Sequence, residues 1–258
     1  MIIVKNSSDI EKLRQGGKIL AEILNTLSGL AASGITTKFL EKEAIKLAES
    51  RNVKPSFLGY QPHGAKEPYP AAVCVSVNDE IVHALPSEKK LAEGDILSID
   101  MGIWHEGLCV DAAVTVGIGK ISQNAAKLIK ITKESLDAGI GILRAGIKTG
   151  DIGYAISNYV EKNGFQVVRD LAGHGVGKNV HEDPIIFNFG KKGAGEIIPA
   201  GSTLALEPMV VEKDWHIKTG PDGWAIKTAD GGIAAHFEHT VLVTENGCEI
   251  LTEQDLRA

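Results

Sequence analysis

Residues 96–116 read ILSIDMGIWHEGLCVDAAVTV, two strand-like apolar runs that each contain one acid, Asp100 or Asp111. Successive side chains of a strand point to opposite faces, so each aspartate shares a face with small and polar neighbours, while the larger apolar residues take the other face. A hairpin that turns near His105-Glu106 sets Asp100 opposite Asp111. The stretch therefore predicts part of an antiparallel sheet with one apolar face and one face that carries paired acids.

The two aspartates need a compensating positive charge, because like charges directly opposite each other destabilise a sheet. No Lys or Arg occurs between Ile96 and Gly119 to supply that charge. A bound metal ion is the simplest source of it. The alternative is a solvent-facing pair of acids on an exposed sheet, and the pair by itself leaves both interpretations open.

Helices and further strands are predicted around this hairpin. Ser8-Asp9-Ile10-Glu11 is a capping-box pattern, and the apolar residues after it recur at helical spacing, which predicts a helix over 8–32. Similar patterns predict helices over 37–51, 122–146 and 149–164. The C-terminal remainder consists of short β-branched runs broken by Gly and Pro, a pattern typical of strands and loops.

One junction occurs twice along the chain. Gly34-Ile35-x-Thr37 matches Gly146-Ile147-x-Thr149, so each half reads as helix, glycine, helix and then strands. Chance is an alternative explanation, because such junctions are common. No Pro/Ser/Gly-rich linker separates the halves. We therefore expect a single domain over 1–258, with two similar halves, about 8–118 and 119–250, around a shared cleft.

The composition excludes several classes of protein. A net charge of −6 gives no basic surface for nucleic acid. No apolar run approaches the roughly 20 residues that span a membrane, and the first residues lack the layout of a signal peptide. The three cysteines are odd in number and far apart, which suits reduced thiols. These features predict a cytoplasmic globular protein with neither nucleic acid nor membrane as a partner.

Two histidines occur in a glycine-rich stretch, His174 within GHGVG and His181 within HEDP. Glycines permit tight backbone paths and close approach of a ligand. Neutral imidazole is the commonest metal ligand, and a second histidine beside a metal can donate to a substrate carbonyl or amide. Each histidine alone could equally be structural. The stretch lacks the full dinucleotide fingerprint and a following helix, so a nucleotide cradle is disfavoured.

Two glutamates complete the set of chemically interesting residues. Glu207 ends the apolar run over 203–206, and Glu238 begins the β-branched run over 238–243. Acids flanked in this way are desolvated at a cost unless they are paired or bind metal, although each could instead be a charge on an edge strand. Four carboxylates and one imidazole favour Mn, Fe, Co or Zn in a two-metal hydrolytic site over a cysteine-rich structural zinc site.

The order of these motifs resembles that of the type I methionine aminopeptidases, members of the pita-bread metalloenzymes. The resemblance covers nearly the whole chain, from Ile10 to Thr240. It rests on the two aspartates, VHALP at 82–86, GHGVG at 173–177, HEDP at 181–184, EPM at 207–209 and FEHT at 237–240. It implies an α+β pita-bread (creatinase/aminopeptidase) fold, a curved antiparallel sheet covered by two pseudo-symmetric helix pairs.

The resemblance also implies the activity and the metal ligands. It implies a metalloaminopeptidase that removes the N-terminal methionine from nascent proteins when the second residue is small. Two divalent metal ions (Co, Mn, Fe or Zn) would be the cofactors. Asp111 and Glu238 would bridge the two ions, with Asp100 on one and His174 and Glu207 on the other.

Further roles are implied for residues around the metals. Glu207 would act as general base, His181 would stabilise the oxyanion, and His83 would bond the scissile amide nitrogen. The methionine side chain would enter an apolar pocket built from Tyr69, Cys74 and Trp224, with Tyr60 as a further wall. The partners would be nascent N-termini, met at the ribosome, and the chain would be a monomer.

Departures from the family pattern affect the pocket more than the chemistry. The stretch 61–68 is an insertion ahead of Tyr69. Val180 stands where many relatives carry phenylalanine, and Ala84 where many carry glycine, so we expect a roomier or reshaped rim. Two alternative functions remain. The first is an Xaa-Pro peptidase, although such enzymes carry an extra N-terminal domain for which we expect no room before Ser8. The second is a non-catalytic pita-bread binding protein, although such proteins tend to lose metal ligands.

Overall fold

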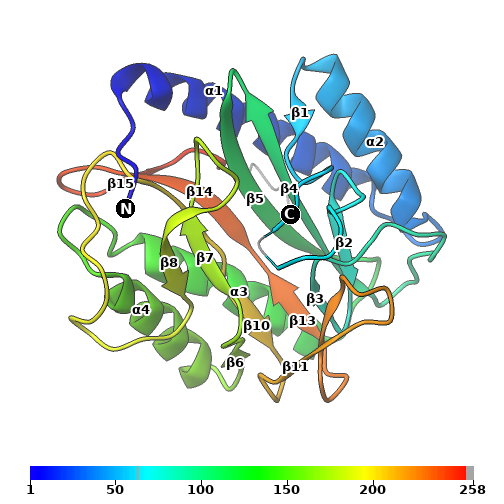
Figure 1. The fold of residues 1–258 in the computed structure, drawn as a ribbon. Helices are drawn as coiled ribbons and strands as arrows, with labels where there is room; N and C mark the ends of the chain where they lie inside the picture. The colour runs from blue at the N-terminus through cyan, green and yellow to red at the C-terminus, as the bar shows by residue number, and fades with distance from the viewer. Residues whose placement is uncertain (63, 254–258) are drawn as a thin grey trace.

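A sheet of nine strands forms the centre of the protein. The structure is a computed structural model that describes residues 1–62 and 64–253. All strand pairings of the sheet are antiparallel. The strand order is β1 (Lys54–Pro55), β4 (Ile96–His105), β5 (Leu108–Gly117), β14 (Glu238–Val243), β9 (Thr203–Leu206), β7 (Ala172–Gly175) and β8 (Glu182–Phe187). In addition, β2 (Cys74–Val77) pairs with β4, and β15 (Cys248–Ile250) pairs with β14. Strands from the first and last parts of the chain therefore meet in the middle of the sheet (Figure 1).

Two three-stranded sheets extend this centre. In one, β10 (Met209–Val211) lies between β13 (Ala234–His236) and β6 (Gln166–Val167). In the other, β12 (Ile226–Thr228) lies between β11 (Ile217–Thr219) and β3 (Glu80–Val82). Both lie toward the same end of the molecule in Figure 1.

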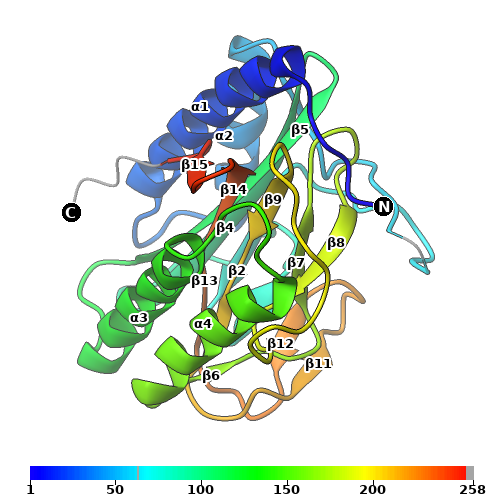
Figure 2. The same cartoon turned by 90° about the vertical axis from the view of Figure 1, so that its left-hand side faces the viewer.

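Four helices cover one side of the large sheet, as the view in Figure 2 shows. They are α1 (Ser7–Leu30), α2 (Thr37–Ser50), α3 (Gln123–Ile140) and α4 (Thr149–Lys162). Within residues 1–62 and 64–253, none of the helices has the length and apolar character that crossing a membrane requires.

Two helix boundaries differ from the sequence-based expectation. The capping box at the start of α1 is formed by Asn6 rather than Ser8: the Asn6 side chain accepts from the Asp9 N–H at 2.9 Å, and the Asp9 carboxylate accepts from the Asn6 N–H. The third helix ends at Ile140, not near 146, because glycines on either side of Ile140 disfavour the helical state by about 1 kcal/mol each.

The hydrophobic core lies between the helices and the sheet. Along β5, Val110, Ala112 and Val114 are buried there together with Leu20 and Leu24 of α1. The residues that alternate with them along β5, Asp111 among them, point to the opposite face. The period-two pattern of the sequence therefore correctly predicted which face is apolar.

The register of the central hairpin corrects one expectation. Asp111 lies opposite Gly102, and Asp100 lies opposite Ala113, so the two aspartates are not a direct pair. The turn falls at Glu106-Gly107, where φ is +47° and +81°, because two residues in the left-handed region match the twist of the strands that they join. Asp100 and Asp111 still share a face, now as diagonal neighbours.

Candidate active site

The strand register brings three of the acids together. Ala113 of β5 lies between Asp100 of β4 and Glu238 of β14, and directly opposed residues point to the same face. Asp111 is two residues from Ala113 and therefore points the same way. Gly102, opposite Asp111, allows close packing here, because a Cβ at Gly102 would overlap the Ser56 hydroxyl and would also lie 3.2 Å from Asp111 Oδ1.

The remaining two members of the predicted set come from the neighbouring strands. His174 of β7 and Thr240 of β14 both lie opposite Ala205 of β9, so His174 shares the face of Glu238, two residues before Thr240. Glu207 follows Ala205 by two residues, immediately after β9 ends. The register thus brings all five sequence-predicted ligand positions to the face of the sheet that lies away from the helices.

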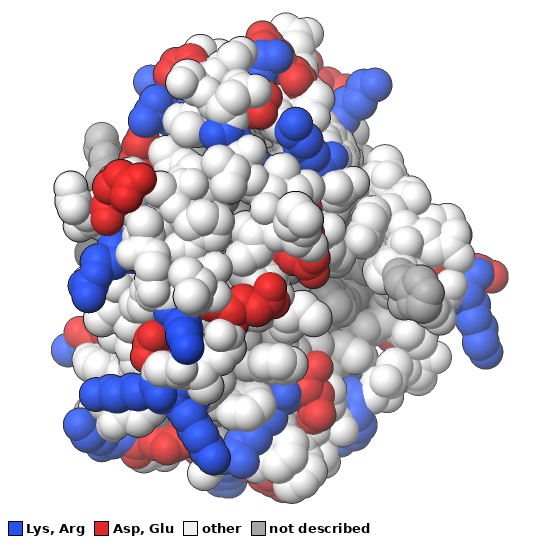
Figure 3. All heavy atoms as spheres, turned by 60° about the vertical axis from the view of Figure 1, so that its left-hand side comes forward, with Lys and Arg blue, Asp and Glu red and all other residues white. Residues whose placement is uncertain are grey.

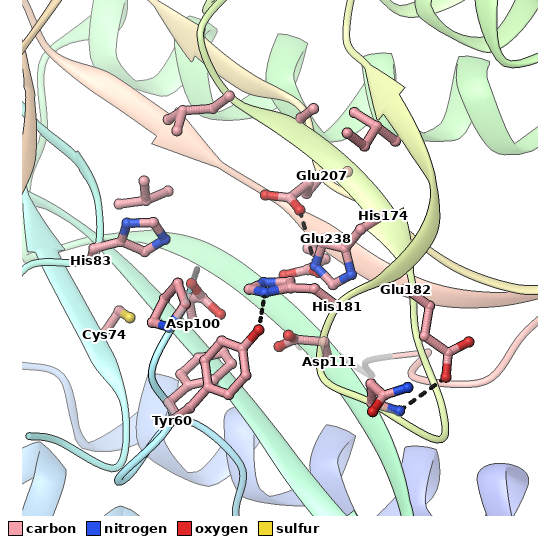
Figure 4. A pocket seen from close by; sticks show the side chains of 18 of the residues that line it. Tyr60, Cys74, His83, Asp100, Asp111, His174, His181, Glu182, Glu207 and Glu238 are labelled. Atoms are coloured by element: carbon pink, nitrogen blue, oxygen red, sulfur yellow. Dashed lines mark hydrogen bonds and ion pairs between the residues drawn. The ribbon is translucent and has the colours of Figure 1, made fainter. Parts of the chain in front are cut away.

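All five line one cavity of about 730 Å³. Figure 4 shows their side chains around its centre, and Figure 3 shows a surface hollow with acidic side chains beside it. One ligand atom each of Asp111, His174 and Glu238 lies within 4.8 Å of the others. Asp100 and Glu207 stand outside this tightest group, but Glu207 Oε1 lies 3.5 Å from His174 Nε2.

The acids in the cavity lack compensating groups. Among the described residues, no hydrogen-bond partner is found for Asp100 Oδ1, Asp111 Oδ1 or Glu238 Oε1, all of which are buried. No Lys or Arg stands among the described residues that line the cavity. A buried carboxylate without a partner is costly. The donor set, rich in oxygen and short of positive charge, therefore fits divalent metal ions.

The pKa values of the acids also show that burial disfavours their charged forms. Burial raises the pKa of Asp100 to about 7. Burial raises the pKa of Asp111, Glu207 and Glu238 well above the ordinary range, and the neighbouring carboxylates raise these pKa values further. Without a cation the cluster would hold protons at neutral pH, and a cation would displace them.

His174 presents its Nε2 to the cavity. Its Nδ1 lies 2.9 Å from the carbonyl oxygen of Gly175, which can only accept, so Nδ1 carries the hydrogen and Nε2 keeps its lone pair. That lone pair lies on the side of Glu207. Burial lowers the pKa of His174 to about 3, which keeps the ring neutral. A neutral imidazole held by a backbone carbonyl is the usual form of a metal-binding histidine.

The two histidines expected to contact substrate reach the cavity from different elements (Figure 4). Desolvation lowers the pKa of His83 and of His181, and both side chains remain open to the cavity. His83 has a φ of +61°, in the left-handed region that costs energy for a residue with a side chain. His181 lies edge-on to His174, with ring centroids 4.4 Å apart.

The expected methionine pocket is a cluster beside the acids. Tyr69, Ala71 and Cys74 form its buried part, and Phe57 and Trp224 pack against them. The rings of Tyr69 and Trp224 meet edge to face with centroids 5.1 Å apart. Tyr69, Cys74 and Trp224 all line the cavity, together with Tyr60. In the inserted stretch 61–68, His63 lies outside the described residues.

Sequence reasoning assigned no role to two features in or beside this cavity. His236 is buried, and its Nε2 lies 3.8 Å from Glu207 Oε2 and 4.0 Å from Glu238 Oε2. Its position two residues before Glu238 was the available signal, because side chains alternate along a strand. Met1 and Ile3 also line the cavity, which no local pattern indicated.

A curved antiparallel sheet with an acid-rich cavity that fits divalent metal ions suits a metal-dependent hydrolase, and the comparisons with known proteins show that class. The chain belongs to metallopeptidase family M24, because the model of that family matches residues 11–245. Several proteins called methionine aminopeptidase are similar to it over nearly their full lengths. That of Clostridium perfringens is 46% identical over 252 residues, covering 98% of this chain and 99% of the relative, and that of Bacillus subtilis is 40% identical with the same coverage.

Solved structures agree with this assignment. The methionine aminopeptidase of Thermotoga maritima matches with a TM-score of 0.94 and 43% identity, covering 98% of this chain and 100% of the other. An Xaa-Pro dipeptidase of Bacillus anthracis matches with a TM-score of 0.79 but only 19% identity, and this chain covers 63% of it, so that likeness shows the fold alone. The expected pita-bread fold and the resemblance to methionine aminopeptidases are thus confirmed.

Proposed function

We propose that the protein is a dinuclear aminopeptidase that removes the N-terminal methionine of polypeptides whose second residue is small. The observation that carries the proposal is the convergence of four buried carboxylates and His174 in one cavity, beside an apolar wall. The identity of about 40–46% to proteins called methionine aminopeptidase supports the substrate class.

Asp100, Asp111, His174, Glu207 and Glu238 would hold two divalent ions, with Asp111 and Glu238 shared between them. Four carboxylates offer enough oxygen atoms for two ions, and the set suits Co, Mn, Fe or Zn. When bound, the metals supply Lewis acidity and lower the pKa of an attacking water. The chain's own residues then have to accept a proton, orient the peptide and stabilise charge.

Glu207 is the proposed general base. Its carboxylate sits between His174 and His236, and burial and neighbouring acids raise its pKa, which makes it a stronger proton acceptor than an ordinary glutamate. His181 would donate an N–H to the oxygen of the scissile carbonyl as negative charge develops there. His83, on another side of the cavity, would bond the scissile amide nitrogen.

The methionine side chain would lie against Tyr69, Cys74 and Trp224. Their edge-to-face rings and buried thiol offer an apolar surface for an unbranched thioether, and sulfur contacts with ring edges are favourable. Tyr60 lines the same cavity. Its hydroxyl bonds to His181, so its side chain joins the pocket to the catalytic group.

We further propose a single catalytic domain over 1–258, with two similar halves, about 8–118 and 119–250. The helix pair α1–α2 precedes one set of strands and the pair α3–α4 precedes another, which supports that division. We propose a cytoplasmic monomer that meets nascent N-termini at the ribosome. The three cysteines, none of them in a disulfide, suit that compartment.

The activity is tested with purified protein and metal counted in the same sample. We expect release of methionine from Met-Ala-x peptides, little release from Met-Ile-x peptides, and two ions per chain. Cleavage of Xaa-Pro peptides instead would support the Xaa-Pro alternative. Peptide binding without turnover would support the non-catalytic alternative, and either result would overturn the proposal.

The ligand set is tested with Glu238→Gln, which keeps the shape of the side chain and removes its charge. We expect fewer than two ions per chain and a loss of methionine release greater than about 100-fold, beyond the effect of groups that only support ligands. Glu49→Gln, an exposed acid near the end of α2, is the matched control and should retain both properties. Full metal content in Glu238→Gln would remove Glu238 from the ligand set.

A further inference from the structure

The hydroxyl of Tyr60 contacts the imidazole of His181. The Tyr60 oxygen lies 2.8 Å from His181 Nδ1, and the two rings pack edge to face with centroids 5.1 Å apart. Figure 4 shows the Tyr60 hydroxyl directed at the His181 ring, inside the cavity that the carboxylates line. Tyr60 therefore holds one of the two ring nitrogens of His181 and leaves Nε2 for other partners.

The backbone fixes Tyr60 in this position. The Tyr69 N–H donates to the carbonyl oxygen of Tyr60 at 2.8 Å, and the Gly59 N–H donates to that of Tyr69 at 2.9 Å. The Tyr60 N–H donates to the carbonyl oxygen of Phe57, also at 2.9 Å. These bonds close the base of the inserted stretch 61–68, so the insertion leaves and returns without displacing Tyr60.

A neutral imidazole has one hydrogen and one lone pair, so the hydrogen bond at Nδ1 determines what Nε2 can do. If the Tyr60 hydroxyl donates to Nδ1, Nε2 carries the hydrogen. If Nδ1 donates instead, Nε2 presents a lone pair. A phenol hydroxyl is a stronger hydrogen-bond donor than a neutral imidazole N–H, and an imidazole nitrogen is a stronger acceptor than a phenol oxygen. The first arrangement, with the hydroxyl as donor, is therefore favoured at the 2.8 Å contact between Tyr60 and His181.

The neighbouring His174 provides the internal comparison. Its Nδ1 faces the Gly175 carbonyl oxygen, which accepts only and so places the hydrogen on Nδ1. The Tyr60 hydroxyl can donate and so permits the opposite tautomer in His181. Two histidines in edge contact thereby differ in chemistry: one offers a lone pair to a metal, and the other offers an N–H to a substrate.

We propose that Tyr60 is a positioning residue that donates its hydroxyl hydrogen to His181 Nδ1 and thereby keeps His181 a hydrogen-bond donor through Nε2. The inference rests on the proposed aminopeptidase function and adds to it a residue outside the ligand set. Tyr60 keeps His181 from becoming an additional metal ligand and holds the N–H toward the oxygen that gains charge. Because the hydroxyl and not the ring performs this role, Tyr60→Phe removes it and leaves the apolar wall in place.

The tautomer is measured directly by two-bond ¹H–¹⁵N correlation spectra of uniformly ¹⁵N-labelled protein, chelated and zinc-loaded. The His181 signals are assigned by their absence in His181→Gln. We expect a lone-pair-type Nδ1 and a protonated Nε2 in both samples of the parent protein, and a mixture of tautomers in Tyr60→Phe. A parent spectrum with the hydrogen on Nδ1, or an Nε2 signal shifted by zinc as a ligand would be, overturns the proposal.

Kinetics on Met-Ala-x peptides provide the second measurement. Loss of one neutral hydrogen bond is worth about 0.5–1.5 kcal/mol, so we expect kcat to fall about 2- to 12-fold with KM nearly unchanged. Tyr159→Phe is the control, because that hydroxyl bonds Glu134 at 2.9 Å outside the cavity. A Tyr60→Phe variant with unchanged tautomer and kcat refutes the inference. A parent protein that releases no methionine refutes the proposed function instead, and the spectra still report on Tyr60.

Discussion

Lys5→Met tests how strongly the N-terminal segment stabilises the loop that carries His181. The Lys5 ammonium lies 2.5 Å from Glu182 Oε2, and the two side chains are 0% and 1% exposed. Glu182 also accepts from the Asn179 N–H at 2.9 Å. Methionine preserves most of the length and apolar stem of Lys5 but leaves the Glu182 carboxylate buried without its cation.

The expected loss of stability in Lys5→Met depends on the burial of the ion pair rather than on the distance between Lys5 and Glu182. Removing one partner of a buried ion pair costs about 3–5 kcal/mol, because an uncompensated charge remains. For a chain of this size, each kcal/mol shifts Tm by about 2–4 °C, so a fall of roughly 6–20 °C is expected. Glu182→Gln added to Lys5→Met removes the remaining charge and should restore most of the loss.

Urea denaturation of the chelated protein measures the free energy of unfolding of each variant. The matched control is Lys46→Met, because Lys46 Nζ also lies 2.5 Å from a carboxylate, that of Glu43, but its side chain is 67% exposed. An exposed pair is worth about 0–1 kcal/mol. Equal losses in Lys5→Met and Lys46→Met would show that burial does not govern this ion pair and would refute the reasoning.

Three further outcomes are expected. Asp111→Asn should make the chelated protein more stable than the parent, because the cost of keeping the buried Asp111 carboxyl protonated at neutral pH is removed, while the rise of Tm that added Co²⁺ should produce in the parent should be lost; an undiminished rise in calorimetry would contradict this. Burial raises the folded-state pKa of Asp100 to about 7, so in the chelated protein Asp100→Asn should match the parent in stability below about pH 4, become the more stable of the two between about pH 4 and 7, and keep that advantage above pH 7; a difference in urea midpoints that does not change with pH would argue against it. Gly153→Ala should lower the free energy of unfolding in urea by about 1–3 kcal/mol, since its Cβ would overlap the Phe187 carbonyl oxygen. Gly29→Ala, with open space around it, should raise the free energy of unfolding by up to about 1 kcal/mol.

Local patterns were sufficient for the elements and for the two faces of the sheet. The alternation over 96–116 correctly separated the core-facing valines from Asp100 and Asp111, because a side-chain period of two depends only on neighbouring residues. The register was less accessible. It depends on the turn at Glu106-Gly107, and placing that turn one residue earlier was enough to make the aspartates a direct pair.

The convergence of the acids with His174 could not be derived from local patterns. It depends on β14 lying between β5 and β9, strands that are far apart in the sequence. Local patterns singled out the four acids and His174, and the resemblance to a known family implied how they share two metals; the register of β9 and β14 then accounts for their common face. Contacts such as Lys5 with Glu182 and Tyr60 with His181 have no sequence signal, because each joins segments more than 100 residues apart.

The position of the acids in the sheet also explains how the fold tolerates them. Asp100, Asp111 and Glu238 lie on strands whose other face packs in the hydrophobic core, so burial of apolar side chains such as Val110 and Val114 stabilises the backbone that holds them. Central strands cannot shift to relieve repulsion between carboxylates without disrupting that core. The acids therefore stay close together in the metal-free protein and hold protons there, and a bound cation would displace those protons and supply the positive charge that the sheet lacks.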